Sequence, residues 1–575
     1  MLCGRDDARK KSVSIYRYLV LALLTFILVT NVSPAVAQYS IPQEQFSIER
    51  SSLLAEGQTK TTVLQNNAEI LAIAIKQARK LRDSRAESYA LGELAHLYEQ
   101  NKQWLEALTL TQQALSLAKG VLAEDIAVNW LWQKGRILKM QGDIKGAINA
   151  YEQAVNSLIS LRKDLLQMDS EVQFSFRDSF EPVYRQFVQL LLQDVDSLPE
   201  IARQENLEKS RQTIEALQLG ELENLFHEGS FNYKLQLIDK IDKEAVVIYP
   251  IILYRRIEVI ISFPGKPLQH YGTNLSVEED SKVFDELRES LNPALLVNEV
   301  LPPAQKLYNW LIRPAEKDIE RNQIKTLVFV LDGFLRSVPM AALHDGKQFL
   351  VEKYNLALSP SLQLLESSKL SSEDFKVLTG GLVQARQGFA ALPSVKKEIE
   401  QIAGYASTMT LLDEKFTRSN IQKQIESFPY TVLHLATHAQ FGSKAQDTFL
   451  LTWEDRITFK DLDRWLKGSS KNLHPQKPIE LLILSACQTA KGDNRAALGL
   501  AGVAVRSGAR STVATLWSVQ DKSTADLVTE FYRLLTQKHL SKTEALRQAQ
   551  LSLLNSSQYN HPYYWSAFVL VGNWL

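Results

Sequence analysis

The spacing of hydrophobic residues divides the chain into two parts with different secondary structure. Up to residue 226 the apolar positions recur every three or four residues, which is the period of amphipathic helices. Beyond residue 226 they gather in short runs, rich in valine, isoleucine and leucine, that alternate with helical stretches. We therefore expect a helical domain over residues 38–226 and an α/β domain over residues 227–575.

Part of the helical domain is repeated. Residues 88–117 can be laid over residues 128–158, with Ala107 on Ala147, and small residues at such positions let antiparallel helices approach closely. The pattern resembles the tetratricopeptide (TPR) repeat, although these alanines are 40 residues apart and about 34 is usual. Stacks of this kind usually bind protein segments, so we expect them to recruit a protein partner or substrate. The alternative is a purely structural helical layer.

The second part begins with a predicted β-hairpin, AVVIYPIIL at 245–253 and IEVIISF at 257–263. The apolar runs that follow alternate with helices, which is typical of a parallel-rich sheet with helices on both faces. In such sheets ligands bind beyond the carboxyl ends of the strands. The predicted strands after the hairpin are TLVFVLDG, FKVLTGGL, YTVLHLATH, IELLILSAC and STVATLWSVQD.

Two of these strands end on residues that can cooperate chemically. YTVLHLATH ends at His438 and IELLILSAC ends at Cys487, so parallel neighbouring strands would bring both to one edge of the sheet. A histidine can take the proton of a cysteine, and the thiolate is the nucleophile of acyl transfer. A lone cysteine can also be a small buried hydrophobe. His434, four residues earlier, is predicted to be a buried, hydrogen-bonded core residue.

The N-terminus has the pattern of a secretory signal peptide. Basic residues precede an uncharged apolar run over 18–29, and an A-x-A cleavage pattern ends at Ala37. We expect residues 1–37 to be removed on export to the periplasm or the medium, and an uncleaved membrane anchor is the alternative. Export would remove Cys3 and leave Cys487 as the only thiol of the mature chain.

Composition limits the remaining functions. The 65 Lys and Arg residues balance 65 Asp and Glu residues, so net charge gives no indication of a nucleic-acid partner. The nine histidines have no ligand-like spacing, and Gly380-Gly381 is too isolated for a phosphate loop, so we predict neither a metal nor a cofactor. Asp332 and Arg336, in LDGFLRSVP, are interpreted as part of an architectural turn.

Ordered motifs in the α/β part carry a family resemblance. The chain contains, in order, LVFVLDGFLRSVP, HLATHAQF, LLILSACQTA, SGARSTVATLWSVQD and HPYYWSAFVLVGNW. Together they resemble the CHAT domain, a caspase-like domain attached to TPR repeats in bacteria and related to the caspase, separase and gingipain cysteine peptidases. The resemblance covers roughly residues 245–575. It implies a caspase-like α/β domain, with a parallel-rich sheet flanked by helices, preceded by an all-α TPR-like domain.

The resemblance also implies a reaction. His438 would activate Cys487, which attacks a peptide bond and forms an acyl-enzyme that water hydrolyses. The backbone N–H groups of Cys487 and Ala439 would form the oxyanion hole. Relatives usually have glycine at the position of Ala439, which matters if the backbone needs a positive φ there. Asp521, in WSVQD, would select a basic side chain before the scissile bond, and capping of the following helix is its alternative role.

Two functions follow from these observations. The first is an exported cysteine endopeptidase that cleaves after a basic residue and uses its helical repeats to recruit a protein partner or substrate. The second is a catalytically silent caspase-like scaffold that acts in protein–protein interaction or signalling.

Overall fold

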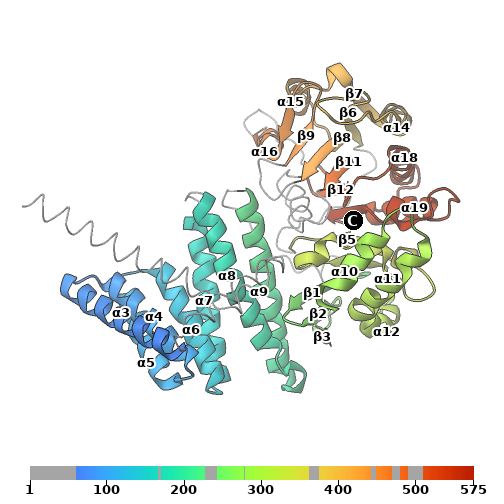
Figure 1. Cartoon of the computed structure of the whole chain (residues 1–575). Helices are drawn as coiled ribbons and strands as arrows, with labels where there is room; N and C mark the ends of the chain where they lie inside the picture. The colour runs from blue at the N-terminus through green and yellow to red at the C-terminus, as the bar shows by residue number, and fades with distance from the viewer. Residues whose placement is uncertain are drawn as a thin grey trace, which may run out of the picture. The chain divides into compact units, whose positions relative to one another are not determined.

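A computed structural model describes most of the chain beyond residue 59 (Figure 1). The chain divides after residue 158 into two compact units, and each is described by itself. None of the helices in the described part is both long and apolar enough to cross a membrane. The predicted signal segment, residues 1–37, lies outside the described residues. The described ranges are 60–165, 170–226, 242–276, 279–361, 375–441, 448–468, 479–489 and 509–575.

Small residues allow the helices of the first unit to approach closely. Ala107 of α5 and Ala147 of α7, which were predicted to be equivalent, are both fully buried. On α4, Gly92 lies so near the ring of Trp130 on α6 that a Cβ would stand 2.2 Å from it. The predicted repeat of antiparallel helices is therefore present. The helices are α3 (Lys60–Leu81), α4 (Ser84–Gln100), α5 (Trp104–Gly120), α6 (Glu124–Met140) and α7 (Ile144–Leu165).

The second unit is built on one large sheet, which has 13 strands within the described residues. The order is β10-β9-β8-β11-β12-β13-β5-β4-β1-β2-β3, and β6 pairs with both β8 and β7. The first seven strands along the chain are β1 (Ala245–Leu253), β2 (Arg256–Ser262), β3 (Gln269–Asn274), β4 (Thr326–Phe329), β5 (Asn355–Leu358), β6 (Lys376–Gly381) and β7 (Ser407–Leu412). The others are β8 (Val432–Phe441), β9 (Phe449–Leu451), β10 (Arg456–Thr458), β11 (Leu481–Thr489), β12 (Ser511–Thr515) and β13 (Phe568–Gly572).

The sheet reverses its direction in the middle. β8, β11 and β12 are parallel to one another, and β6 is parallel to β8. β12 then pairs with β13 in antiparallel orientation, while β13, β5, β4 and β1 are mutually parallel. The carboxyl ends of β4 and β8 therefore lie at opposite edges. The parallel-rich sheet was predicted correctly, but it consists of two parallel groups of opposite direction.

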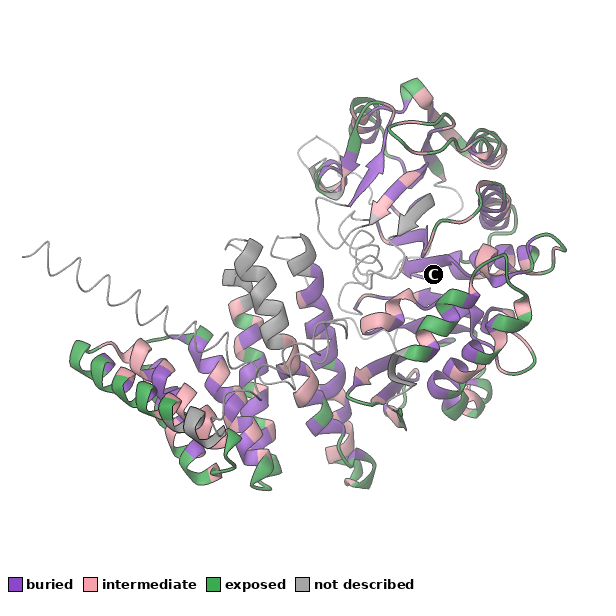
Figure 2. Cartoon of the chain, viewed as in Figure 1, coloured by how far each residue is buried: buried purple, intermediate pink, exposed green. Residues whose placement is uncertain are grey.

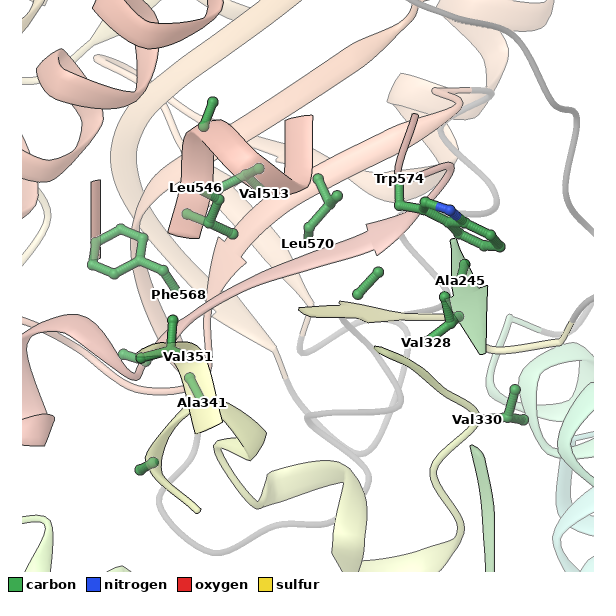
Figure 3. Packing of buried hydrophobic residues seen from close by; sticks show 14 of the residues in the cluster. Ala245, Val328, Val330, Ala341, Val351, Val513, Leu546, Phe568, Leu570 and Trp574 are labelled. Atoms are coloured by element: carbon green, nitrogen blue, oxygen red, sulfur yellow. The ribbon is translucent and has the colours of Figure 1, made fainter. Parts of the chain in front are cut away.

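Helices cover both faces of the sheet, because alternate strand residues point to opposite sides. Ile483 of β11 belongs to one hydrophobic cluster and its neighbour Leu482 to another. The first cluster extends under both halves of the sheet, since it includes Val328, Val513 and Leu570 from β4, β12 and β13 (Figure 3). Figure 2 shows the same pattern, with buried strands between helices that expose their outer sides.

The helices of the second unit cover these clusters. They include α8 (Ser170–Leu192), α9 (Glu200–Phe226), α10 (Glu279–Ser290), α11 (Val297–Leu311), α12 (Glu316–Arg321) and α13 (Leu350–Lys353). After them come α14 (Ser394–Ala403), α15 (Arg418–Ser427), α16 (Phe459–Gly468), α18 (Asp521–Gln537), α19 (Lys542–Leu554) and α20 (Pro562–Trp565).

α8 and α9 belong to the unit that contains the sheet. The Arg185 guanidinium of α8 donates two hydrogen bonds, of 2.7 and 3.1 Å, to the buried carboxylate of Asp332, which follows β4. Arg336 in the same turn donates a 2.6 Å hydrogen bond to Glu221 of α9. The turn predicted to be architectural thus anchors two helices. The compact units consequently divide after residue 158, whereas the change in periodicity suggested a division after residue 226.

Candidate active site

β8 and β11 bring the two predicted catalytic residues to one edge of the sheet. The strands are parallel neighbours, as the prediction required. His438 stands opposite Ala486 in the register, and Cys487, the next residue of β11, stands opposite Ala439. His438 and Cys487 are therefore one register position apart near the carboxyl ends of their strands. The side chain of Cys487 lies outside the described part of the structure.

A bulge precedes this pair. Between Leu484 and Ala486 of β11 the register with β8 shifts, so β8 carries one residue more at that point. Both strands also continue farther than the apolar runs indicated. β8 ends at Phe441 and β11 at Thr489, because polar residues beyond the apolar run still take part in the ladder.

The imidazole of His438 is partly exposed and contacts the segment between β6 and α14. Its Nε2 lies 2.8 Å from the carbonyl oxygen of Ala390. A carbonyl can only accept a hydrogen bond, so Nε2 carries the proton and donates it. When the ring carries a single proton, its lone pair is therefore on Nδ1. The ring of Phe389 packs beside the imidazole, with centroids 5.0 Å apart and planes at 34°. The two contacts fix both the tautomer and the plane of the imidazole.

The backbone at Ala439 needs no glycine. Ala439 is a buried strand residue that pairs with β11 on one side and with Leu450 of β9 on the other. It is not among the residues with positive φ. An alanine methyl group therefore introduces no backbone strain at the position where glycine is usual.

Asp521 lies beyond the carboxyl end of β12, at the same edge as His438. Asp521 is the first residue of α18, and Gln520 is its N-cap. The Asp521 Oδ2 atom accepts a 2.7 Å hydrogen bond from the backbone N–H of Ser394, the first residue of α14. The carboxylate therefore caps a helix, but that helix is α14 rather than α18. Its partly exposed side chain keeps a second oxygen for which the described residues show no hydrogen bond.

His434 occupies a buried polar cluster, as predicted. Its ring is fully buried between α14 and α18. Nδ1 lies 3.3 Å from the Tyr532 hydroxyl, and Nε2 lies 2.9 Å from Glu398 Oε1, although not along the direction of a hydrogen bond. Burial, and then the charge of Glu398, raise the pKa of Tyr532 well above its ordinary value. The hydroxyl therefore stays protonated.

No motif in the sequence indicated that the segment from Leu382 to Ser394 contacts His438. It contains a tight turn in which Gln387 and Gly388 have φ values of 48° and 85°, and Arg386 and Phe389 pair across it. The Gln-Gly dipeptide is a weak turn signal, and only the fold shows which side chain lies beneath it.

The two glycines before this segment have a packing role. A Cβ on Gly380 would stand 2.3 Å from the ring of Phe416, and one on Gly381 would stand 2.6 Å from a methyl carbon of Val395. They let β6 lie directly under these side chains. In the described part of the chain no three His, Cys, Asp or Glu residues are grouped as metal ligands would be.

The architecture defines a class: antiparallel TPR-like helices in one unit, and in the other an α/β domain with a parallel-rich sheet that carries a histidine and a cysteine on adjacent strands. Comparison with protein families shows which known domains the two parts are similar to. Residues 301–573 match the CHAT domain family, and residues 86–160 match a tetratricopeptide repeat family. The resemblance and the fold class predicted from the sequence are thereby confirmed. A search of curated proteins found no match.

Solved structures also match parts of the chain, and three of them illustrate the extent of the similarity. The Arg specific cysteine proteinase gingipain R matches with 10% identity and a TM-score of 0.31, over 51% of this chain and 74% of that chain. The complex of the pro- and mature domains of RgpB from Porphyromonas gingivalis matches with 10% identity and a TM-score of 0.30, over 52% and 77%. TPR-like repeats of a putative kinesin light chain from Podosopora anserina match with 20% identity and a TM-score of 0.17, over 28% and 84%.

Proposed function

We propose that the protein is a cysteine endopeptidase whose catalytic dyad is His438 and Cys487. The observation that carries this proposal is the parallel pairing of β8 and β11, with the two residues one register position apart. The match of residues 301–573 to the CHAT family, which has a caspase-like cysteine-peptidase fold, supports the same conclusion.

The orientation of His438 suits a general base. Because Nε2–H donates to the Ala390 carbonyl, Nδ1 is the nitrogen that accepts the thiol proton of Cys487. The thiolate then attacks the peptide carbonyl carbon, and the imidazolium returns its proton to the leaving amine as the C–N bond breaks. Water hydrolyses the resulting thioester and regenerates the thiol. The backbone N–H groups of Cys487 and Ala439 stabilise the oxyanion in this scheme.

The proposed substrate is a protein or peptide with a basic residue before the scissile bond. Asp521 is the residue that would receive this side chain, since it lies beyond β12 at the edge that carries the dyad. One carboxylate oxygen binds Ser394, and the other is available for a guanidinium or an ammonium group.

The helical repeats are proposed to recruit the substrate or a partner protein. The match of residues 86–160 to the tetratricopeptide family supports this role, because such repeats generally mediate protein–protein interaction. Export is a separate proposal that depends on the sequence of residues 1–37. Amino-terminal sequencing of protein from the periplasm or the medium tests it, and a mature chain that begins at Gln38 is the expected result.

The peptidase proposal is tested with reporter peptides that differ only in the residue before the scissile bond: arginine, lysine or aspartate. Turnover of the basic peptides, lost in Cys487→Ala and in His438→Ala, is expected. Ser485→Ala is the matched control, because the buried Ser485 hydroxyl on the same strand has no hydrogen-bond partner in the described structure and its loss leaves nothing unpaired. A preference for aspartate would refute the role of Asp521. The silent scaffold would be favoured by two results together. One is the absence of turnover with peptide and protein substrates, and the other is a biological phenotype that is lost when the helical repeats are deleted but kept in Cys487→Ala and His438→Ala.

A further inference from the structure

The segment between β6 and α14, which supplies the Ala390 carbonyl to His438, is held by a side chain from outside it. Val383 N–H and Gln384 N–H donate hydrogen bonds of 2.9 and 3.2 Å to the same oxygen, Oδ1 of Asp413. Asp413 directly follows β7 and has no role in the proposed chemistry. Its carboxylate is a fixed point for the first residues of the segment.

The backbone at Asp413 has a conformation that few residues adopt. Its φ of 46° lies in the left-handed region, where aspartate, asparagine and glycine are favoured over other residues. In this conformation the chain turns sharply after β7, and the carboxylate reaches the start of the neighbouring segment. Sterics at this position restrict the choice of residue, and of the favoured residues only aspartate and asparagine also offer an acceptor.

Further hydrogen bonds pass this constraint to the residue that contacts the imidazole. Leu392 N–H donates to Val383 O at 3.0 Å, which closes the segment into a loop, and Leu382 N–H donates to Ala436 O of β8 at 3.2 Å. The contact of Ser394 with Asp521 holds the far end. Ala390 lies between the closing bond and the tight turn, so the position of its carbonyl depends on both ends of the loop.

We propose that Asp413 is a positioning residue for the catalytic histidine. By binding the two N–H groups at the base of the loop, it holds the Ala390 carbonyl where it accepts the Nε2–H of His438 and keeps the lone pair on Nδ1. The catalytic consequence rests on the proposed peptidase function, but the effect on the tautomer of His438 does not. The peptidase function and the role of Asp413 in fixing the tautomer can therefore be refuted separately.

The test uses the full chain with two substitutions that both tolerate a left-handed backbone. Asp413→Gly removes the acceptor without backbone strain, and Asp413→Asn keeps an oxygen at the same place. Glu414→Ala is the matched control, since Glu414 is exposed and adjacent. The first readout is the ¹⁵N spectrum of the histidine rings, in which His438 is assigned by the signal that disappears in His438→Ala.

We expect the wild-type protein, Asp413→Asn and Glu414→Ala to show the Nε2–H tautomer of His438. Asp413→Gly should give a mixture of tautomers and faster amide hydrogen exchange over residues 382–394, with the core strands unchanged. If the protein cleaves the basic reporter peptide, kcat in Asp413→Gly should fall by about 10- to 100-fold with little change in KM, because a displacement of about 1 Å is enough for that loss.

Two results would overturn the inference. One is an unchanged tautomer of His438 in Asp413→Gly. The other is an Asp413→Asn variant that shows the same mixture of tautomers as Asp413→Gly, since the acceptor retained in Asp413→Asn should preserve the wild-type tautomer. If wild-type protein has no peptidase activity, the tautomer and the hydrogen exchange still decide the role of Asp413. If Asp413→Gly does not fold, Asp413→Ser is measured instead, because its shorter side chain cannot reach both N–H groups. Serine also strains a backbone with a φ of 46°, so the readout is taken with the hydrogen exchange of the core strands as the check that only the loop has changed.

Discussion

The buried pair between Arg185 and Asp332 should be among the most sensitive points of the second unit. The Asp332 side chain is fully buried and accepts hydrogen bonds from both Nη atoms of Arg185 and from Ile252 N–H at 2.9 Å. Asp332→Ala would leave the guanidinium of Arg185, a side chain that is 23% exposed, facing an empty buried site. Removing one partner of a buried pair costs about 3–5 kcal/mol, and we expect the lower end because Arg185 also binds Glu181.

Urea denaturation, followed by far-UV circular dichroism, measures this loss of unfolding free energy. Asp285→Ala is the control, because its pair with Arg288 is about half exposed and should contribute less than about 1 kcal/mol. Replacement of both Arg185 and Asp332 by apolar residues should recover most of the loss, since neither charge of the pair is then left buried without its partner. A loss below about 1 kcal/mol in Asp332→Ala, or no recovery in the double variant, would refute the reasoning.

The pair also predicts a dependence of stability on pH. Burial by itself would raise the pKa of Asp332, but the charge and hydrogen bonds of Arg185 lower it below its ordinary value. A carboxyl group with a lowered folded-state pKa stabilises the protein above its unfolded pKa of about 3.9, and this contribution is lost as the pH falls through the folded-state value. The destabilisation by Asp332→Ala should therefore be constant near neutral pH and shrink in acid.

Three further predictions test other parts of the molecule. Burial lowers the pKa of Lys542 to about 8 in the folded protein, below its unfolded value of about 10.4. Between these two pH values the unfolded state binds more protons, so stability should rise with pH, and Lys542→Met should abolish that rise in thermal melts. Gly92→Ala should destabilise the repeats by about 1–3 kcal/mol, because its methyl group would overlap the Trp130 ring, whereas Gly120→Ala, with nothing within 4 Å, should be harmless in the same melts. His438→Ala should abolish peptide turnover yet leave the melting temperature nearly unchanged, since the side chain is partly exposed and makes one hydrogen bond.

Periodicity predicted the elements that bury continuous apolar runs. The hairpin of β1 and β2, and the parallel pairing of β8 with β11, followed from runs whose residues are nearly all buried. The short strands β9 and β10 were missed, because three residues are too few to establish a period. The reversal of direction at β13 was missed for a different reason: the burial pattern of a strand is the same whichever way its neighbour runs.

Side chains at the candidate site were predictable when they ended an apolar run, and not otherwise. His438 and Cys487 stood out because polar chemistry begins abruptly there. Asp413 and Ala390 lie 23 residues apart in the chain. They are linked only through the loop between β6 and α14, in which Asp413 binds Val383 and Ala390 binds His438. Backbone carbonyls carry no sequence signal, so the group that orients the imidazole could not be found before the fold was known.

The reversal of the sheet separates the stabilising contacts of the second unit from its candidate chemistry. Asp332 follows β4, and His438 is near the end of β8, so the two lie at opposite edges because their strands run in opposite directions. The helices α8 and α9 are anchored at the Asp332 edge, while the loop and the Asp413 carboxylate serve the other edge. Substitutions at Arg185 or Asp332 should therefore change the free energy of unfolding without changing the tautomer of His438, whereas Asp413→Gly should change that tautomer.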